Sequence, residues 1–571
     1  MEKTGKILAI FLLIILFFAI FFAAALNAIR KSAYERSYYK NEPISAIRGA
    51  IVTSDNLTLA AGRRSYSVAF DGRYAEDKEL IADLSAIFLR KSKKQIMELL
   101  DKDVRVYLAR DLSTQEARNF HHLSGELDRR GAFKSFNQNG MWVRYGFEIV
   151  ESDSSARLYP YGDLAQPVLG FVQKITGYGQ IGLERYYDMR FNAEKDGALK
   201  ALRDAGGNLI YSNAMSLTKP RHGVSLLLSL NGRLQSDLER VVDEARLLND
   251  AQEVIAAVME SESGRVLAFA SSARFDAANI TPESLRNARI NAIQYAFEPG
   301  SVMKPFIVAL LFEEGLAGQF DLVRTYGGRF KLGKETITDL APREWMSVED
   351  VVVYSSNIGI AQLAMKLNPY KISDGLNGFG FACESGIDLP YESAGDSPGL
   401  NGYRSDVYRA TTGYGYGIRT TFIQLLKAYN VFNNGGVSVT PRLIDAVFGE
   451  NAPAMENAES VRVISLNTSQ RMLQILRKTV VKGNAKQALI DGIFTAGKTG
   501  TAHIARGGVY LNDYHNSFFG FANDDMNRYA IGALVIDPKN RHYASQTAAP
   551  IFRDTVLLLK KYDLIKSAAV N

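Results

Sequence analysis

A serine and a lysine three residues apart precede a strongly apolar segment of the chain. Ser301 and Lys304 follow Pro299-Gly300, and residues 306–311 are all apolar. Pro-Gly ends the preceding element, and Pro305 is tolerated in a first helical turn because the N–H groups there lack an intrahelical partner. Residues i and i+3 share one helix face, so the Lys304 amine is expected beside the Ser301 hydroxyl. Such a serine is a nucleophile, and a lysine made neutral by burial is its base.

Two further motifs follow this pair along the chain. Ser-x-x-Lys alone is a weak signal, because it also occurs at Ser37–Lys40 and Ser216–Lys219. The informative feature is an ordered set: Ser301-x-x-Lys304, then Ser355-Ser-Asn357, then Lys498-Thr499-Gly500-Thr501.

The second and third motifs lie at places in the predicted secondary structure where side chains can reach a substrate. Ser355 follows a helical segment, residues 347–354, that begins with the capping-box-like Ser347-x-x-Asp350. Lys498 and the three residues after it lie in a β-like run, where Gly500 would let a substrate backbone approach the strand edge.

Antiparallel strands with helices between them must position these motifs. Residues 254–259 and 266–270 predict a hairpin, since Gly264 lies in the turn between them. Further strands are predicted at 494–504, 517–522 and 529–536, followed by a helix at 549–562. Strands at both ends of the region, with helices between, predict an α+β fold with one antiparallel sheet and a helical insertion.

The ordered motif set resembles that of the penicillin-recognising serine acyltransferases, in which S-x-x-K, S-x-N and K-T-G occur in this order. Within them the chain is similar to class B penicillin-binding proteins, which are monofunctional D,D-transpeptidases of peptidoglycan. The resemblance covers nearly the whole chain and includes landmarks outside the three motifs: Arg48-Gly49-x-Ile51, Leu59-Ala60, Tyr159-Pro160, Gly170, Gly182-Leu183-Glu184, Gly264–Ala268, Tyr414–Ile418 and Asn434–Gly436.

The resemblance implies roles for the first two motifs. Ser301 would attack the carbonyl of a D-Ala-D-Ala stem peptide, and β-lactams would acylate the same residue. Lys304 would be the base, made neutral by burial and by a second lysine nearby. Ser355 would relay a proton to the leaving amine, and Asn357 would hold the substrate amide.

The third motif is expected to bind the substrate. By the resemblance, Lys498 and Thr499 would attract the terminal carboxylate, with Lys498 counted among the catalytic residues. Gly500 and Thr501 would line the substrate-binding strand. Backbone N–H groups of Ser301 and Thr501 would stabilise the oxyanion, and one such donor typically contributes about 3–4 kcal/mol.

Composition excludes several other kinds of protein. The 571 residues carry 67 Lys and Arg against 61 Asp and Glu, a net charge of +6, which is too mild for a dedicated nucleic-acid binder. One cysteine excludes a disulfide framework or a cysteine-rich metal site, and six scattered histidines give no metal-binding helix pattern. No metal or cofactor is therefore expected. The glycine-rich Gly413–Gly417 fits no phosphate-binding pattern and predicts a turn.

An apolar segment near the N-terminus predicts membrane attachment. Ile7–Leu26 contains no polar side chain and is long enough to span the hydrocarbon core. A cleaved signal peptide is the alternative, since Ala23-Ala24-Ala25 could supply a cleavage site, but its apolar region is usually shorter. The flanking charges mildly favour the opposite orientation, yet long C-terminal domains translocate largely regardless of them. The chemistry places the catalytic domain outside, on a single-pass protein of the bacterial cytoplasmic (inner) membrane.

Five regions are predicted along the chain. They are a cytoplasmic tail (1–6), a transmembrane helix (7–26), a stalk (27–47), a mixed α/β pedestal of the dimerisation type (48–221) and the transpeptidase domain (222–571). Within the pedestal, Glu79–Leu100 predicts one helical stretch. Residues 53–56 depart from the family pattern, which leaves the fine structure of the pedestal open.

Other activities on the same fold remain open. A β-lactamase needs a water-activating carboxylate and usually lacks an anchor and a pedestal. A D,D-carboxypeptidase would use water as acceptor, and a β-lactam sensor would keep the fold without turnover. The intact motifs and the pedestal-like region favour the transpeptidase.

The cellular role is expected to be septal cell-wall synthesis during division. Septal members of the family usually carry Ser-x-Asn and Lys-Thr-Gly, as this chain does, whereas elongation members that maintain cell shape often carry Ser-x-Asp and Lys-Ser-Gly. A glycosyltransferase of the SEDS family, together with other division proteins, would be the partner in the membrane, because no polymerase motif is evident here.

Overall fold

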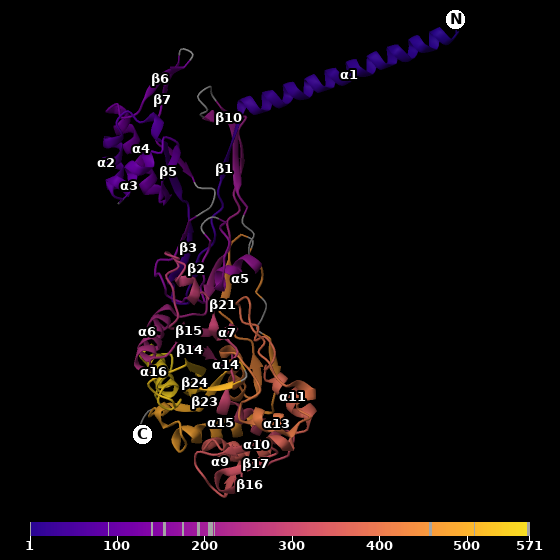
Figure 1. Cartoon of the computed structure of the whole chain (residues 1–571), viewed down its shortest axis with the longest axis vertical. Helices are drawn as coiled ribbons and strands as arrows, with labels where there is room; N and C mark the ends of the chain where they lie inside the picture. The colour runs from indigo at the N-terminus through magenta and orange to yellow at the C-terminus, as the bar shows by residue number, and fades with distance from the viewer. Residues whose placement is uncertain are drawn as a thin grey trace. The chain divides into compact units, whose positions relative to one another are not determined.

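The computed structural model describes residues 2–89, 91–138, 141–151, 156–173, 176–190, 195–203, 209–210, 212–450, 452–455, 459–507 and 509–567. The chain forms two compact units (Figure 1). Unit 1 comprises residues 1–48, 63–156 and 193–223, and unit 2 comprises residues 49–62, 157–192 and 224–571. Each unit is therefore built from separate stretches of sequence.

A five-stranded antiparallel sheet forms the centre of unit 2. Its strands run in the order β15-β14-β25-β24-β23 and are β14 (Glu253–Glu260), β15 (Val266–Ser271), β23 (Phe494–Arg506), β24 (Val509–Asn523) and β25 (Arg528–Ile536). The N-terminal hairpin pairs with the C-terminal hairpin through β14 and β25. The predicted α+β fold with one antiparallel sheet is confirmed, and β23, which carries the third motif, is an edge strand.

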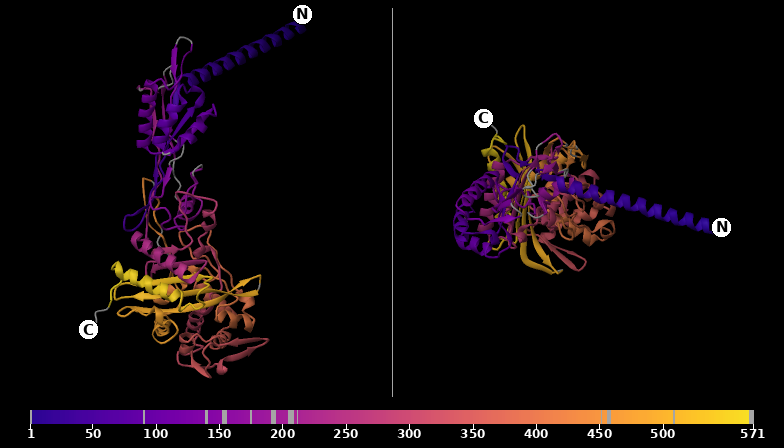
Figure 2. Two further views of the ribbon diagram at one scale, coloured as in Figure 1. Left: turned by 60° about the vertical axis from the view of Figure 1, so that its left-hand side comes forward. Right: turned by 90° about the horizontal axis from the view of Figure 1, so that it is seen from above.

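The two faces of this sheet pack against different helices. In β14, Ile255 and Ala257 belong to one apolar core, and Val254 and Ala256 belong to the other, as the period of two along a strand requires. α6 (Gly232–Asn249) and α16 (Ala548–Lys561) cover one face, and Figure 2 shows α16 in yellow beside the strands. α8 (Lys304–Glu313) and α14 (Phe422–Asn433) belong to the core on the other face.

The helical insertion lies between β15 and β23. Its helices are α7 (Asn291–Gln294), α8, α9 (Val348–Val353), α10 (Asn357–Lys366), α11 (Pro369–Gly378), α12 (Gly399–Gly402), α13 (Asp406–Gly413), α14 and α15 (Leu466–Val481). Its short strands are β16 (Leu322–Arg324), β17 (Arg329–Leu332), β18 (Glu335–Thr338), β19 (Trp345–Ser347), β20 (Val437–Val439), β21 (Ile444–Phe448) and β22 (Ser460–Arg462). α8 is buried almost throughout, which agrees with its uniformly apolar sequence.

Early segments of the chain complete unit 2. β2 (Ile51–Val52) pairs with β3 (Thr58–Arg63) and, in parallel, with β13 (Ser225–Leu228), and β9 (Ala156–Leu158) and α5 (Gly182–Arg190) follow later in the chain. The landmark Gly49 lies directly against the backbone of the segment before β13, where a Cβ would come within 1.7 Å of the Val224 oxygen.

Unit 1 has its own apolar core. It contains β4 (Tyr66–Asp71), β5 (Arg105–Leu112) and β8 (Glu148–Glu151) in one sheet, with α2 (Lys78–Leu89), α3 (Lys93–Leu100) and α4 (Thr114–Arg129). β6 (Ser135–Gln138) pairs with β7 (Met141–Arg144), and β10 (Gly197–Arg203) pairs with β1 (Tyr39–Ile44), β11 (Leu209–Ile210) and β12 (Ser216–Thr218).

The helical stretch expected at Glu79–Leu100 is two helices rather than one. α2 ends at Leu89, and α3 begins at Lys93. Ser92 caps α3 by accepting a hydrogen bond from the Gln95 N–H, and the Gln95 side chain accepts from Ser92 in return. This capping box starts a new helix where the apolar pattern alone predicts continuation.

The N-terminal segment forms one long apolar helix. α1 spans Glu2–Tyr38, and within it Ile10–Arg30 has a mean hydropathy of 2.8 and is exposed along its length. Length and composition are consistent with a single-pass membrane anchor. Part of the region predicted as a stalk, residues 27–47, thus continues this helix, and another part forms strand β1.

A buried ion pair ties two landmarks of unit 2 together. Arg157 Nε donates to Glu184 Oε1 at 2.7 Å, and Arg157 Nη1 donates to the Gly49 carbonyl at 2.6 Å. The side chains of Arg157 and Glu184 are only 5% and 0% exposed.

Arg157→Met should lower the free energy of unfolding by about 3–5 kcal/mol, because it leaves the Glu184 carboxylate buried without its guanidinium partner. Urea unfolding of the full chain measures the change. Arg553→Ala is the control, since its ion pair with Asp554 is exposed, and it should change stability by less than about 0.5 kcal/mol. Equal effects of the two substitutions would contradict a structural role for the buried pair.

Candidate active site

Ser301 lies in a tight turn at the start of a buried helix. The turn is a 3₁₀ helix, Gly300–Met303, and α8 begins only at Lys304. The sequence predicts that Ser301 opens the α-helix, but in the structure Ser301 precedes it. Gly300 has a φ of 65°. A Cβ there would be strained and would also lie 3.1 Å from the Ala502 Cβ on β23. Glycine therefore lets the turn that carries Ser301 approach the edge strand.

The Lys304 amine lies at the centre of the hydrogen bonds in the site. Its Nζ lies 2.8 Å from Ser301 Oγ, 3.0 Å from Ser355 Oγ and 2.8 Å from Asn357 Oδ1. It also donates to the Ser355 carbonyl at 2.9 Å. The structure thus brings together the first two predicted motifs through direct hydrogen bonds.

The surroundings of Lys304 favour its neutral form. The side chain is 0% exposed, and burial holds the pKa of its amine well below the usual value of 10.5. The like charge of Lys498 lowers this pKa further, whereas the carboxylate of Asp339 opposes the shift. A neutral amine in hydrogen-bond contact with a serine hydroxyl can accept its proton.

Ser355 and Asn357 come from the connection between α9 and α10. Ser347 caps α9 by accepting from the Asp350 N–H, as the capping-box-like sequence predicts. Ser355 has a φ of 62°, an uncommon conformation for a residue other than glycine. In this backbone conformation, both the hydroxyl and the carbonyl of Ser355 accept hydrogen bonds from the Lys304 amine.

Lys498 joins the cluster from β23. Its Nζ donates to Ser355 Oγ at 3.0 Å and to the Thr499 carbonyl at 3.2 Å. The side chain is 0% exposed, and burial lowers the pKa of its amine to about 7. Ser355 Oγ therefore lies between two lysine amines, so a proton can pass between them through one hydroxyl.

The remaining residues of the third motif make contacts outside this cluster. Thr499 Oγ1 donates to Asn484 Oδ1 at 3.2 Å, and Thr501 Oγ1 accepts from the Ala544 N–H at 3.2 Å. A Cβ on Gly500 would lie 2.6 Å from Ser517 Oγ and 2.8 Å from the Pro299 carbonyl. Ser517 on β24 and Pro299 before the Ser301 turn thus leave no room for a side chain at position 500, whereas the sequence argument invoked a substrate backbone.

Asp339 is a site residue that the sequence argument missed. Its carboxylate accepts from the Ser356 hydroxyl at 2.5 Å and from the N–H groups of Asn357 and Ile358 at 2.6 and 3.1 Å. It therefore holds the first turn of α10, where a negative charge is favourable, and fixes the position of Asn357. Nothing in the motif pattern marks this aspartate, because it lies in a loop after β18 and its contacts are with residues that come 17 to 19 positions later in the sequence.

The glycine-rich Gly413–Gly417 segment supports the turn that carries Ser301. Gly300 N–H donates to the Gly415 carbonyl at 3.1 Å, and Gly417 N–H donates to Glu298 Oε1 at 2.8 Å. Gly415 has a φ of 85°, and a Cβ there would lie 2.0 Å from the Gly300 carbonyl oxygen. The segment packs against the residues on either side of Pro299.

Comparison with known proteins identifies the family. The model of the penicillin binding protein transpeptidase domain matches residues 254–557, and that of the penicillin-binding protein dimerisation domain matches residues 43–228. The chain is a class B penicillin-binding protein. Its enzymatic activity is that of a peptidoglycan D,D-transpeptidase.

Relatives of this penicillin-binding protein share most of its length. Penicillin-binding protein PbpB of Mycobacterium tuberculosis is 28% identical over 586 residues, which cover 97% of this chain and 83% of the relative. The probable peptidoglycan D,D-transpeptidase PenA of Neisseria meningitidis is 26% identical over 566 residues, or 97% of this chain and 92% of the relative.

A solved structure shows the same fold. It is penicillin-binding protein 3 of Mycobacterium tuberculosis, complexed with aztreonam, and the match has a TM-score of 0.67 at 24% identity. The match covers 92% of this penicillin-binding protein and 100% of the solved chain.

Asp339→Asn tests the electrostatics of the site. Removing the negative charge lowers the pKa of Lys304 further, because that charge favours the ammonium form. The acid limb of the pH profile for acylation by a fluorescent penicillin should therefore move to lower pH. The rate should also fall about ten- to hundredfold, because Asn357 loses its anchor.

Asp374→Asn, an exposed change on α11, is the matched control and should alter neither the rate nor the profile. An acid limb that stays in place or moves to higher pH in Asp339→Asn would contradict the assigned electrostatics.

Proposed function

We propose that Ser301 is the nucleophile of the transpeptidase and that Lys304 is its base. The 2.8 Å contact between Lys304 Nζ and Ser301 Oγ carries the proposal. As Ser301 Oγ attacks the carbonyl carbon of the penultimate D-alanine, its proton passes to the neutral Lys304 amine. Lowering the pKa of that amine by burial keeps it able to accept a proton near neutral pH.

Ser355 would relay the proton to the leaving group. Its hydroxyl is 3.0 Å from each of Lys304 Nζ and Lys498 Nζ. When the bond between the two alanines breaks, the proton taken from Ser301 moves through Ser355 to the amine of the departing D-alanine. An acyl-enzyme at Ser301 results, and Lys304 is neutral again.

The second half-reaction reverses these proton movements. An amine from a second stem peptide attacks the acyl-enzyme carbonyl and gives up a proton to the Lys304–Ser355 pair, and Ser301 recovers its proton as it leaves. Asn357, whose position Asp339 fixes, would hold the substrate amide. The same site with water as acceptor would be a D,D-carboxypeptidase.

The third motif would bind the end of the substrate. Lys498 has a pKa lowered to about 7, and an approaching carboxylate would favour its charged form. Thr499 would add a hydroxyl to that carboxylate. Backbone N–H groups of Ser301 and Thr501 would bind the oxyanion, since Gly300 and Gly500 let the turn and the strand lie close together.

β-Lactams would acylate the same serine, as mimics of the D-Ala-D-Ala end. The support is the motif set and the fold shared with a relative whose structure holds aztreonam. A β-lactamase would need a carboxylate free to activate water. The three donors to Asp339 already occupy the carboxylate that contacts this cluster.

The domain assignment is part of the proposal. Residues 48–221 would form the pedestal and residues 222–571 the catalytic domain, attached by residues 27–47 to a transmembrane helix at 7–26 and a short cytoplasmic tail at 1–6. The apolar helix supports a single-pass protein of the cytoplasmic membrane with its catalytic domain on the outer side.

The cellular role that we propose is septal peptidoglycan synthesis. Ser355-Ser-Asn357 and Lys498-Thr-Gly500 are the motif variants usual in septal members, whereas elongation members often have Ser-x-Asp and Lys-Ser-Gly. Glycan polymerisation would come from a SEDS-type glycosyltransferase in the same membrane, in contact with the anchor and the pedestal.

Ser301→Ala should abolish covalent labelling by a fluorescent penicillin, because the acyl bond forms at that oxygen. Gel fluorescence of the full chain in detergent measures it. Ser405→Ala, at an exposed position before α13, should label as the wild type does. Labelling that survives in Ser301→Ala would overturn the nucleophile assignment.

Depletion of the protein in its host should give filamentous cells, since septal cross-linking stops while side-wall growth continues. Microscopy during depletion, with and without a plasmid copy, provides the readout. Complementation by the wild type but not by Ser301→Ala would link the shape change to catalysis. Round cells on depletion would assign the enzyme to elongation instead.

A further inference from the structure

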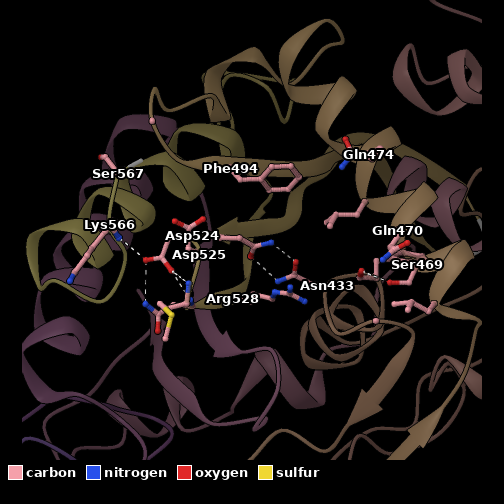
Figure 3. Close-up of a pocket in the computed structure, with 18 of the residues that line it drawn as sticks. Asn433, Ser469, Gln470, Gln474, Phe494, Asp524, Asp525, Arg528, Lys566 and Ser567 are labelled. Atoms are coloured by element: carbon pink, nitrogen blue, oxygen red, sulfur yellow. Dashed lines mark hydrogen bonds between the residues drawn. The ribbon is translucent and has the colours of Figure 1, made fainter. Parts of the chain in front are cut away.

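A cavity of about 970 Å³ lies beside the sheet in unit 2, near the start of β23 (Figure 3). Its walls come from the end of α14, the first turns of α15, Phe494, the β24–β25 turn and the segment after α16. Phe494 and Thr499 are five positions apart on β23, or roughly 16 Å along an extended strand. The cavity is therefore separate from the catalytic cluster, and its volume is at the upper end of those that hold small ligands.

Uncharged amides on three elements line the cavity. Gln470 and Gln474 lie one turn apart on α15 and are exposed, and Figure 3 shows them on the same side of the opening. Asn433 contributes from α14, and Asn527 contributes from the β24–β25 turn. The exposed amides of Gln470 and Gln474 each carry both donors and an acceptor.

Hydrogen bonds fix the side chains of Asn433 and Asn523 at the wall of the cavity. Asn433 Nδ2 donates to Asn523 Oδ1 at 3.0 Å, and Asn523 Nδ2 donates back to Asn433 Oδ1 at 2.7 Å. Asn433 also donates to Ser261 Oγ at 2.8 Å. A polar surface with fixed side chains loses little entropy when a ligand binds to it.

The charges around the cavity nearly balance. Asp524 accepts from the N–H groups of Met526, Asn527 and Lys566, so its carboxylate organises the turn. Asp525 and Asp563 are opposed by the basic side chains of Arg528 and Lys566. This balance disfavours a phosphate or another polyanion and favours a neutral ligand rich in polar groups.

An aromatic ring completes the lining. Phe494 is partly exposed at the wall, and the guanidinium of Arg477 lies 5.3 Å from its ring centroid. Amides that bind hydroxyl and acetamido groups, together with a ring that packs on a C–H face, form a surface suited to a sugar.

We propose that this cavity binds N-acetylated sugar units of the glycan strand whose stem peptides the enzyme cross-links. The identity of the ligand rests on the peptidoglycan transpeptidase function, because the substrate polymer carries such sugars next to every stem peptide. Binding there holds a strand near the catalytic cluster and raises the effective concentration of its stem peptides.

α15 connects the cavity to the substrate-binding strand. Its first turns carry Gln470 and Gln474, and Arg477 Nη1 donates to the Thr495 carbonyl on β23 at 2.7 Å. Beyond its end, Asn484 accepts from Thr499 Oγ1. A glycan bound to α15 would therefore contact a helix that is bonded to β23 at Thr495 and is followed closely by Asn484, which contacts the third motif.

Calorimetric titration of the full chain in detergent with chitotetraose, a tetramer of β-1,4-linked N-acetylglucosamine, tests the proposal. Benzylpenicillin first acylates Ser301, so that the catalytic cleft is occupied. We expect a dissociation constant of about 1 mM or lower, and at least about tenfold weaker binding in the double variant Gln470→Ala/Gln474→Ala. Cellotetraose, which lacks the acetamido groups, should also bind at least about tenfold more weakly.

Asn467→Ala, an exposed change on α15 outside the cavity, is the matched control and should bind chitotetraose like the wild type. The double variant should be acylated by benzylpenicillin at the wild-type rate. No binding up to about 10 mM, or equal binding by the double variant, would overturn the proposal. Failure of acylation with sugar binding intact would instead count against the proposed nucleophile, so the two failures are distinguishable.

Discussion

The burial of one lysine amine is the constraint on which the rest of the catalytic unit depends. Lys304 is fully buried, and among the described residues its hydrogen-bond partners are the uncharged oxygens of Ser301, Ser355 and Asn357. An ammonium group taken from water into such surroundings costs several kcal/mol, and neutralisation is the way to avoid that cost. The fold thus lowers the pKa of an ordinary lysine by placing it on a helix that the core covers almost completely, which is what the proposed role of Lys304 as a base requires.

Several features around this amine keep its partners in contact. Glycines at positions 300 and 500 let the turn that carries Ser301 lie against the edge strand. Ser355, whose backbone is in the left-handed conformation, presents both a hydroxyl and a carbonyl to the amine. A second buried lysine, Lys498, meets the same serine from the other side. Together, the antiparallel sheet and the helical insertion bring the three motifs, which are distant in sequence, within hydrogen-bond distance of one another.

The sequence was sufficient to predict the three motifs but only part of the structure that positions them. Spacing and order predicted Ser301, Lys304 and the other motif residues as the site, and strand patterns predicted the sheet, because these signals are local. Asp339 stayed hidden, since its contacts with α10 arise only when a loop folds back through space. The interleaving of the two units was equally invisible, because pairing of β2 with β13 joins residues more than 150 positions apart.

The protonation state of Lys304 in the folded enzyme is the most direct test of this account. Lysine labelled with ¹³C at Cε reports that state by NMR, and loss of one signal in Lys304→Met assigns the resonance. The account predicts the chemical shift of a neutral amine at pH 7, with the titration displaced well below that of the exposed lysines. A Lys304 signal that keeps the ammonium shift up to pH 10, as an ordinary lysine does, would contradict it.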